Sequence, residues 1–351
     1  MLIFRITYKG GIVMDMRQWF RQLYDAKQKP ALPILSFPSA QLLNISVKEL
    51  ITSGEMQANG MKAIADRTPS AAAVSLMDLS VEAEAFGSQI RFSDDEVPTV
   101  VGRIIQNQSD ADNLKVPPVG AKRTGVYIQC ISHALELIHD RPVFAGIIGP
   151  YSLAGRLMDV SEIMVNCYME PDMVHTTLDK CTDFLIQYAA AFKAAGAHGM
   201  IIAEPLTGLL SPDMASEFSA PYVKRLVSAV QDDSFAVIYH NCGNNTWRMI
   251  DAILESGADA YHFGNAVDMS VILSQMPSDI LVMGNVDPAG QFRQGTPESI
   301  REATLELLEK CGGHKNFIPS SGCDIPPLAK WENIDAFFRT VEDFYAKRPI
   351  M

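Results

Sequence analysis

The chain alternates between two hydrophobic patterns. Short apolar or β-branched runs, each followed by a polar turn, are separated by longer segments in which apolar residues recur every three or four positions. This order is typical of parallel strands joined by crossover helices. The clearest helical segment starts at Pro171, carries apolar residues from Val174 to Phe192 and stops at Gly196, as helices with an N-terminal proline and a C-terminal glycine do. The apolar run that follows, 199–203, predicts a buried strand.

The same pattern predicts eight strands along the chain. They cover residues 34–37, 73–79, 143–148, 199–203, 236–240, 260–263, 281–285 and 317–319. Eight parallel strands with intervening helices make an α/β fold of the (β/α)8 TIM-barrel type. The segment 91–118 is rich in Asp, Asn, Gln and Pro, and it is too long for a simple connection, so it predicts an insertion or flap. An open doubly wound sheet is the alternative, but no glycine-rich phosphate loop follows the first predicted strand.

The chain is expected to contain one large domain. Residues 1–30 are predicted to form an N-terminal extension with a leading helix, and residues 31–351 a single barrel domain. Residues 1–13 are not a convincing signal peptide, since Arg5 and Lys9 interrupt the apolar stretch and no small-residue cleavage site follows. We interpret them as an upstream start or a disordered tail.

The charge balance limits the expected partners. The formal net charge is −12 and the pI is near 5.0, whereas nucleic acids and anionic membranes attract clustered Lys and Arg, so neither is expected. No apolar run approaches the roughly 20 residues that span a bilayer. The six cysteines are scattered rather than spaced as a small disulfide framework, which predicts a protein of the reducing cytoplasm.

Candidate metal ligands fall where a barrel would place its active site, just after the C-terminal ends of strands. His240 ends the fifth predicted strand, Cys242 follows it, and Cys323 lies in the loop after the eighth. One imidazole and two thiols are typical zinc ligands, and three protein ligands leave a fourth position open for a substrate. A buried histidine beside an unreactive cysteine is the alternative, and the spacing alone leaves both open.

Other polar residues fall at the same predicted rim. Asp78 and Glu204 are carboxylates delivered by apolar strands, and each is either a catalytic group or a partner for loop amides. Further residues at or just after predicted strand ends are Tyr151, His262, Asn285 and Asp287.

Five sequence blocks resemble the uroporphyrinogen decarboxylase superfamily and, more closely, its methylcobamide:coenzyme M methyltransferase branch. The blocks are 77–87 (MDLSVEAEAFG), 149–155 (GPYSLAG), 240–244 (HNCGN), 284–288 (GNVDP) and 321–327 (SGCDIPP). The resemblance runs from about residue 31 to the C-terminus. It implies the same barrel fold that the hydrophobic pattern predicts.

The two branches of the superfamily differ at positions that can be compared here. The decarboxylases carry an Arg-Gln-Ala-Gly-Arg stretch near the first strand, where residues 33–39 of this chain read PILSFPS. They also have a histidine in the loop after the last strand, where this chain has Cys323. His240, Cys242 and Cys323 instead match the zinc ligands of the methyltransferases. Asp78 matches the aspartate that contacts the tetrapyrrole in the decarboxylases.

The resemblance implies a zinc-dependent methyltransferase. The methyl donor would be a methylated corrinoid (a methylcobamide) carried by a corrinoid-binding protein, and the acceptor a small thiol such as coenzyme M, with another thiol or a pterin left open. A thiol bound to zinc loses its proton near neutral pH and becomes the nucleophile. Asp78 and Glu204 are the candidate catalytic residues. Glu204 is also a candidate for a fourth zinc ligand. A homodimer is compatible with the resemblance. The residues expected to face the substrate or corrinoid are Tyr151, Asn244, His262, Asn285 and Asp287.

Two other hypotheses stay open. One is a decarboxylase of tetrapyrrole (porphyrin or heme) metabolism that uses Asp78 without a metal. The other is a non-catalytic protein that binds a corrinoid protein or a small molecule and keeps the barrel with a structural zinc.

Overall fold

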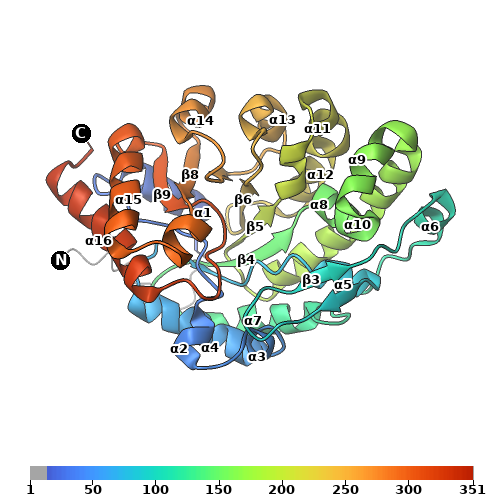
Figure 1. Cartoon of the computed structure of the whole chain (residues 1–351), viewed down its shortest axis with the longest axis horizontal. Helices are drawn as coiled ribbons and strands as arrows, with labels where there is room; N and C mark the ends of the chain where they lie inside the picture. The colour runs from blue at the N-terminus through green and yellow to red at the C-terminus, as the bar shows by residue number, and fades with distance from the viewer. Residues whose placement is uncertain (1–13, 351) are drawn as a thin grey trace.

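Parallel strands enclosed by a ring of helices make up the computed structural model, which describes residues 14–350 (Figure 1). Seven strands form one sheet in the order β1-β4-β5-β6-β7-β8-β9, and every neighbouring pair is parallel. The α/β barrel prediction is confirmed. The predicted tail, 1–13, lies outside the described residues. The strands are β1 (Ala73–Val74), β4 (Val143–Ile148), β5 (Gly199–Ala203), β6 (Ala236–Asn241), β7 (Ala260–Phe263), β8 (Leu281–Val286) and β9 (Phe317–Ser321).

The predicted first strand, 34–37, is not a strand in the structure. Residues before it nevertheless fill the gap between β9 and β1, because the Leu32 amide donates to the Pro319 carbonyl and the Ala71 amide to the Ala31 carbonyl, each at 2.9 Å. Prolines flank the segment on both sides and lack the N–H that a regular ladder needs. An extended segment therefore completes the ring in place of an eighth strand.

The predicted second strand, 73–79, is too long. The ladder ends early because the Ser75 hydroxyl, rather than a backbone carbonyl, accepts the hydrogen bond of the Gly146 amide at 2.9 Å. Asp78 consequently lies in the loop after β1 instead of closing a strand. The other six predicted strands are confirmed to within two residues at each end.

Alternate strand residues fill the barrel interior. One buried apolar cluster combines side chains from the strands: Phe144, Ile201, Ile238, Ala260, Met283 and Ile318. Side chains alternate between the two faces of a strand, so His240, His262 and Ser320, each two residues beyond a member of this cluster, point into the same interior. The barrel therefore has an apolar lower layer and a polar layer at the C-terminal ends of its strands.

Helices cover the outside of the sheet. Among the described residues, no helix combines the length and the apolar character needed to cross a membrane. The helices on the barrel are α2 (Ser39–Leu43), α3 (Val47–Ile51), α4 (Gly54–Arg67), α5 (Val81–Phe86), α7 (Thr124–Leu137), α8 (Pro150–Met158), α9 (Val160–Met169), α10 (Pro171–Ala194), η1 (Pro205–Leu209), α11 (Pro212–Phe218), α12 (Ala220–Val230), η2 (Thr246–Arg248), α13 (Ile250–Leu254), α14 (Met269–Gln275), η3 (Pro288–Arg293), α15 (Pro297–Cys311) and α16 (Trp331–Lys347).

The longest helix, α10, follows the sequence pattern closely. Pro171 occupies its first turn, and Gly196, just beyond its end, has φ +97°, a conformation that glycine adopts without steric cost. Val174, Leu178 and Leu185 are fully buried against the barrel. The three- and four-residue spacing of its apolar side chains thus predicted the packing face correctly.

The predicted insertion at 91–118 is confirmed as a separate excursion. It begins two residues earlier than predicted, with β2 (Gln89–Arg91), which pairs antiparallel with β3 (Thr99–Val101); α6 (Gln108–Asn113) follows. Arg293 in η3 pairs with Glu96 in the hairpin loop at 2.8 Å. The flap is therefore tied to the loop that follows β8.

A leading helix, α1 (Met16–Asp25), packs against the barrel interior. Its buried side chains Met16, Trp19 and Leu23 belong to the same apolar cluster as the interior strand residues. The rings of Trp19 and Phe144 lie 5.6 Å apart. This helix closes the apolar layer of the barrel, and the domain boundary at residues 30 and 31 stays a prediction.

Candidate metal centre

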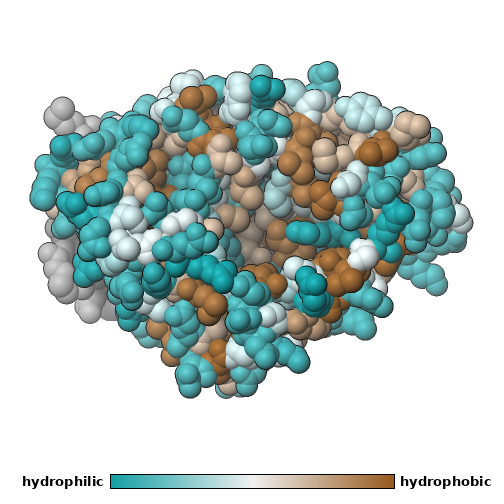
Figure 2. All heavy atoms as spheres, in the orientation of Figure 1, coloured by the Kyte–Doolittle hydropathy of each residue, from teal (hydrophilic) through white to brown (hydrophobic). Residues whose placement is uncertain are grey.

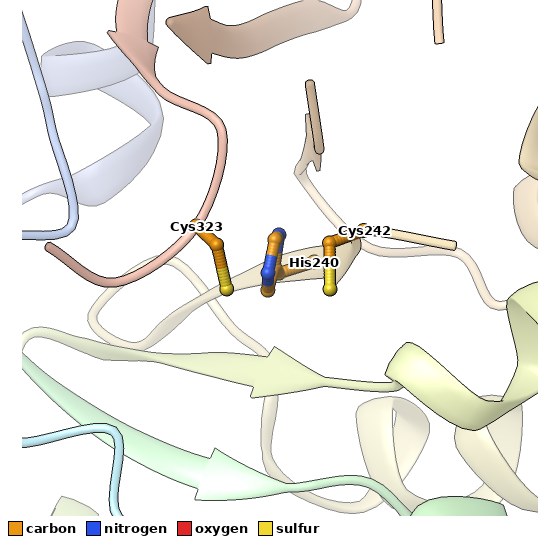
Figure 3. A group of neighbouring side chains, drawn as sticks. All are labelled: His240, Cys242 and Cys323. Carbon is orange, nitrogen blue, oxygen red and sulfur yellow. The ribbon is translucent and has the colours of Figure 1, made fainter. Parts of the chain in front are cut away.

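The structure brings the three predicted ligands together. His240 lies in β6, Cys242 directly follows that strand, and Cys323 follows β9 by two residues. One ligand atom from each lies within 4.8 Å of the others. Figure 3 shows the His240 imidazole between the two thiol groups.

The donor atoms fit a tetrahedral metal ion. His240 is 2% exposed, and its Nε2 is buried without a hydrogen-bond partner, which is costly unless something binds the atom. Zinc lies about 2.0–2.3 Å from nitrogen and sulfur ligands, so it holds such donors roughly 3.5–3.8 Å apart. The three donor atoms, all within 4.8 Å of one another, are therefore close to the spacing that a tetrahedral zinc ion needs.

The pKa values of the two thiols move in opposite directions. A hydrogen bond from Cys323 and the neighbouring His240 lower the pKa of Cys242 well below its usual range. The same sulfur–sulfur contact, together with burial, raises the pKa of Cys323. A divalent cation favours the deprotonated form of both thiols. The surroundings of the two cysteines therefore fit metal ligands better than unreactive thiols.

Backbone packing holds the loop that carries Cys242. The Asn241 side-chain oxygen accepts hydrogen bonds from the Gly243 amide at 2.9 Å and the Thr246 hydroxyl at 3.0 Å. A Cβ on Gly264 would lie 2.5 Å from the Cys242 Cα. The loops after β6 and β7 therefore approach as closely as they do only because residue 264 has no side chain.

The loop that carries Cys323 is held by its neighbour. Both carboxylate oxygens of Asp324 accept from the Ser36 hydroxyl, at 3.1 and 3.0 Å. Burial raises the pKa of Asp324 to about 8. The contact joins the loop after β9 to the extended segment that completes the barrel.

Glu204 is at the predicted rim but is not part of the metal group. It is fully buried, and its oxygens accept from the amides of Tyr151 and Ser152 at 2.8 and 3.0 Å, and from the hydroxyls of Ser152 and Thr207 at 2.7 and 3.2 Å. Burial raises the pKa of Glu204 to about 7. Its acceptors are occupied by the first turn of α8, which assigns it to anchoring that helix and argues against a fourth-ligand role.

Asp78 lies in a second buried cluster at the rim. Its Oδ2 pairs with Arg123 and accepts from the Tyr127 hydroxyl at 2.9 Å, while Oδ1 accepts from the Ser80 amide and hydroxyl. Arg123 also pairs with Glu84 at 2.6 Å. Asp78 is 4% exposed, so little of its carboxylate is available to a substrate.

Two residues predicted to face the substrate or the corrinoid are buried in the structure. Tyr151 is fully buried, with its hydroxyl 3.7 Å from the Cys167 sulfur. His262 is also fully buried, and its two ring nitrogens contact His240 and Ser320 at 2.8 Å each. Burial, together with His240, lowers the pKa of His262 well below its usual range. His262 thus contacts a candidate metal ligand through one ring nitrogen and a barrel serine through the other.

The other residues predicted to face the substrate or the corrinoid differ in their surroundings. The Asn285 amide donates to the carbonyls of Gly264 and Val267 at 2.9 Å each. Asp287 accepts from two backbone amides at the start of η3, whereas Asn244 is exposed. Asn285 and Asp287 thus hold loops and are partly exposed, and a contact of Asn244, Asn285 or Asp287 with the substrate or corrinoid stays a prediction.

Sequence reasoning missed Ser320, Arg123 and Tyr127. Strand alternation carries a signal for Ser320, because it is two residues beyond the interior residue Ile318. Arg123 begins α7 in a segment without strand or motif pattern, so its pairing with Asp78 depends on tertiary packing that the sequence does not display.

Comparison with known proteins identifies the family that this chain matches. The family model described as uroporphyrinogen decarboxylase (URO-D) matches residues 30–344. A methylcobamide:CoM methyltransferase of Methanosarcina acetivorans is 26% identical over 271 residues, which are 76% of this chain and 78% of that protein. A uroporphyrinogen decarboxylase of Hydrogenovibrio crunogenus is 27% identical over 293 residues, 80% of this chain and 81% of its own. A solved methyltransferase structure from Methanosarcina mazei covers 93% of this chain and 98% of its own at TM-score 0.80 and 24% identity, which establishes the shared fold.

Proposed function

Because the chain belongs to the uroporphyrinogen decarboxylase family, whose matched relatives are methyltransferases and decarboxylases, we propose that it is a zinc-dependent methyltransferase. It moves a methyl group from a protein-bound methylcobamide to a small thiol such as coenzyme M. The observation that carries the proposal is the convergence of His240, Cys242 and Cys323 with an unpartnered, buried His240 Nε2.

The ligand set suits activation of a thiol. When bound, zinc would lower the pKa of the acceptor thiol so that the thiolate predominates near neutral pH. Two cysteine thiolates and one neutral imidazole would hold the ion with little net charge, which would preserve the nucleophilicity of the acceptor sulfur. In the proposed reaction this sulfur would take the methyl group, and the electron pair of the broken carbon–cobalt bond would stay with the corrinoid product.

A protein that carries the methyl donor would have to approach the C-terminal face of the barrel. Some of the exposed large apolar side chains among the described residues lie in the segments directly after barrel strands: Leu209 in η1 after β5, Trp247 in η2 after β6, and Leu328 after β9. Figure 2 shows one face of the molecule, which is hollowed near its centre. Exposed apolar groups in the loops after barrel strands are typical of a protein-docking surface, which supports a corrinoid-binding protein as the partner.

The decarboxylase alternative receives less support from the same face. A substrate with many carboxylates needs free cationic side chains, yet Arg123 is already paired with Asp78 and Glu84. The Asp78 oxygens are likewise occupied by Arg123, Tyr127 and Ser80. A metal-free reaction centred on Asp78 would first have to break this buried cluster.

Metal analysis tests the proposed site. The purified protein is expected to contain about one zinc per chain and to lose it when Cys242 or Cys323 is changed to Ala. Cys311→Ala is the matched control, because Cys311 is a buried cysteine at the end of α15 and outside the metal group. A wild-type protein without zinc, or a Cys311→Ala variant that loses as much zinc as the other two, would contradict the proposal.

Turnover separates an enzyme from a metal-containing binding protein. With methylcobalamin and a panel of thiols, the wild-type protein is expected to convert the methylated corrinoid to its cob(I)alamin form and to release a methyl thioether. The Cys242→Ala variant should lose at least about 100-fold in rate, since the acceptor thiol is no longer activated. Zinc-replete protein that turns over none of the thiols would favour the non-catalytic hypothesis.

A further inference from the structure

A chain of hydrogen bonds runs from the candidate ligand across the barrel. His240 Nδ1 lies 2.8 Å from His262 Nδ1, His262 Nε2 lies 2.8 Å from the Ser320 hydroxyl, and that hydroxyl lies 2.6 Å from the Leu32 carbonyl. These residues come from β6, β7, β9 and the extended segment that completes the ring. The chain therefore crosses the polar layer of the barrel.

The number of available protons fixes the direction of each bond. A carbonyl oxygen only accepts, so the single Ser320 hydroxyl proton goes to Leu32, and the Ser320 oxygen must accept from His262 Nε2–H. A neutral imidazole has one N–H, which leaves His262 Nδ1 as an acceptor. His240 Nδ1 must then be the donor.

A second contact also places the proton of His240 on Nδ1. The backbone carbonyl of His262 lies 3.3 Å from His240 Nδ1, and this oxygen can also only accept. Both neighbours of His240 Nδ1 thus require a proton on that nitrogen. The remaining nitrogen, Nε2, carries a bare lone pair, and it is the buried atom without a partner.

We propose that His262 and Ser320 are positioning residues that lock His240 in its Nδ1–H tautomer and so present the Nε2 lone pair to the metal. The inference rests on the proposed zinc site, and it assigns His262 a role within the barrel rather than at the corrinoid. Histidine ligands are commonly oriented in this way by a partner on the other ring nitrogen, and loss of that partner weakens metal binding about 10- to 100-fold.

Adjacent serines of β9 provide a matched test. Ser320 and Ser321 are both fully buried, but the Ser321 hydroxyl accepts from the Ile34 amide at 3.0 Å and takes no part in the histidine chain. Zinc affinity, measured by competition with a chromophoric chelator, is expected to fall about 10- to 100-fold in Ser320→Ala. It should stay within about threefold of wild type in Ser321→Ala and in Ser320→Thr, which keeps the hydroxyl. Equal losses in both alanine variants, or no loss in Ser320→Ala, would overturn the proposal.

Nitrogen NMR of the metal-free wild-type protein tests the tautomer directly, because it needs no metal in the protein. With ¹⁵N-labelled histidine, and His240 assigned by its absence in His240→Gln, the spectrum should show His240 protonated at Nδ1 and His262 at Nε2. A His240 protonated at Nε2 would refute the inference. If the wild-type protein binds no zinc, the proposed function fails, whereas the tautomer result still decides this inference separately.

Discussion

At the residue scale, hydrogen-bond partners distinguish ligands from scaffold residues. The oxygens of Glu204 and Asp78 are occupied by loop amides, hydroxyls and a guanidinium. His240 Nε2 is buried and has no such partner. A buried polar atom left unpaired is expensive, so among the predicted site residues His240 is the one whose surroundings point to a bound ion.

Another buried residue, Glu82, gives a prediction about pH. Burial raises its pKa from 4.5 to about 8, so between these values the folded protein keeps a proton that the unfolded chain has lost. Stability therefore falls as pH rises through this window and is not reduced below pH 4.5. Glu82→Gln keeps an acceptor for the Ile148 amide, bonded at 3.1 Å, and removes the titration.

Urea denaturation at pH 5 and pH 8.5 measures this effect. The stability difference between Glu82→Gln and wild type is measured at each pH. From pH 5 to pH 8.5, the free energy of unfolding of Glu82→Gln is expected to rise by about 2–5 kcal/mol relative to that of wild type. Glu302→Gln, at an exposed position of α15, should show no such change. Equal pH dependence in wild type and Glu82→Gln would contradict the assignment.

The sequence predicted the role of a site residue only where the residue lies in a recognisable motif. His240, Cys242 and Cys323 fall at strand ends and carry metal-binding side chains. Glu204 also falls at a strand end, but its donors come from residues 52 and 53 positions earlier. A position at the rim can be read from strand periodicity, whereas the partner that occupies a carboxylate is set by tertiary packing.

At the scale of elements, a buried arginine joins the loops of the rim. Arg123 at the start of α7 contacts Asp78 in the loop after β1 and Glu84 in α5. It also lies 5.0 Å from the ring of Phe92 in the flap. One side chain thus holds the loop, a helix and the flap in a common arrangement.

Removing this arginine should destabilise the protein strongly. Arg123→Ala leaves Asp78 buried without its counterion, which typically costs about 3–5 kcal/mol. The double variant with Asp78→Asn should lose at least about 1 kcal/mol less than the sum of the two single variants, measured by urea denaturation. Arg225, whose ion pairs with Asp179 and Asp183 are exposed, is the control, and its Ala variant should lose less than about 1 kcal/mol. Additive effects of Arg123→Ala and Asp78→Asn would be inconsistent with this cluster.

The hydrophobic pattern predicted the elements with strong periodicity correctly, but it predicted the first two strands poorly. Six strands and α10 carry continuous apolar runs or a regular helical spacing. At 34–37 flanking prolines prevent a ladder, and after Val74 a side-chain hydroxyl takes over from the backbone. Apolar runs therefore located these segments correctly but could not predict how their hydrogen bonds are made.

At the scale of the whole molecule, the residues that stabilise the barrel and the residues of the metal group lie in different layers. The helix α1 packs Trp19 into the apolar layer, and the metal group lies at the strand C-terminal ends. Barrels commonly divide the two functions between their two ends. Changes in α1 should therefore alter stability without altering the site.

Trp19→Ala tests this separation. Trp19 is 3% exposed, and its truncation should lower the free energy of unfolding by about 3–5 kcal/mol through the cavity that it leaves. Zinc content should stay at the wild-type value. Trp247→Ala, at a side chain 41% exposed, should cost less than about 1 kcal/mol. A Trp19→Ala variant that folds but loses zinc would show that the two ends are coupled.

Zinc K-edge X-ray absorption, recorded with and without coenzyme M, tests the central claim most directly. The zinc-loaded protein is expected to show two sulfur ligands and one imidazole with a lighter atom in the fourth position, and addition of the thiol should raise the sulfur number to three. A sulfur number that stays at two in the presence of saturating thiol, or a zinc bound by four protein ligands, would contradict the account.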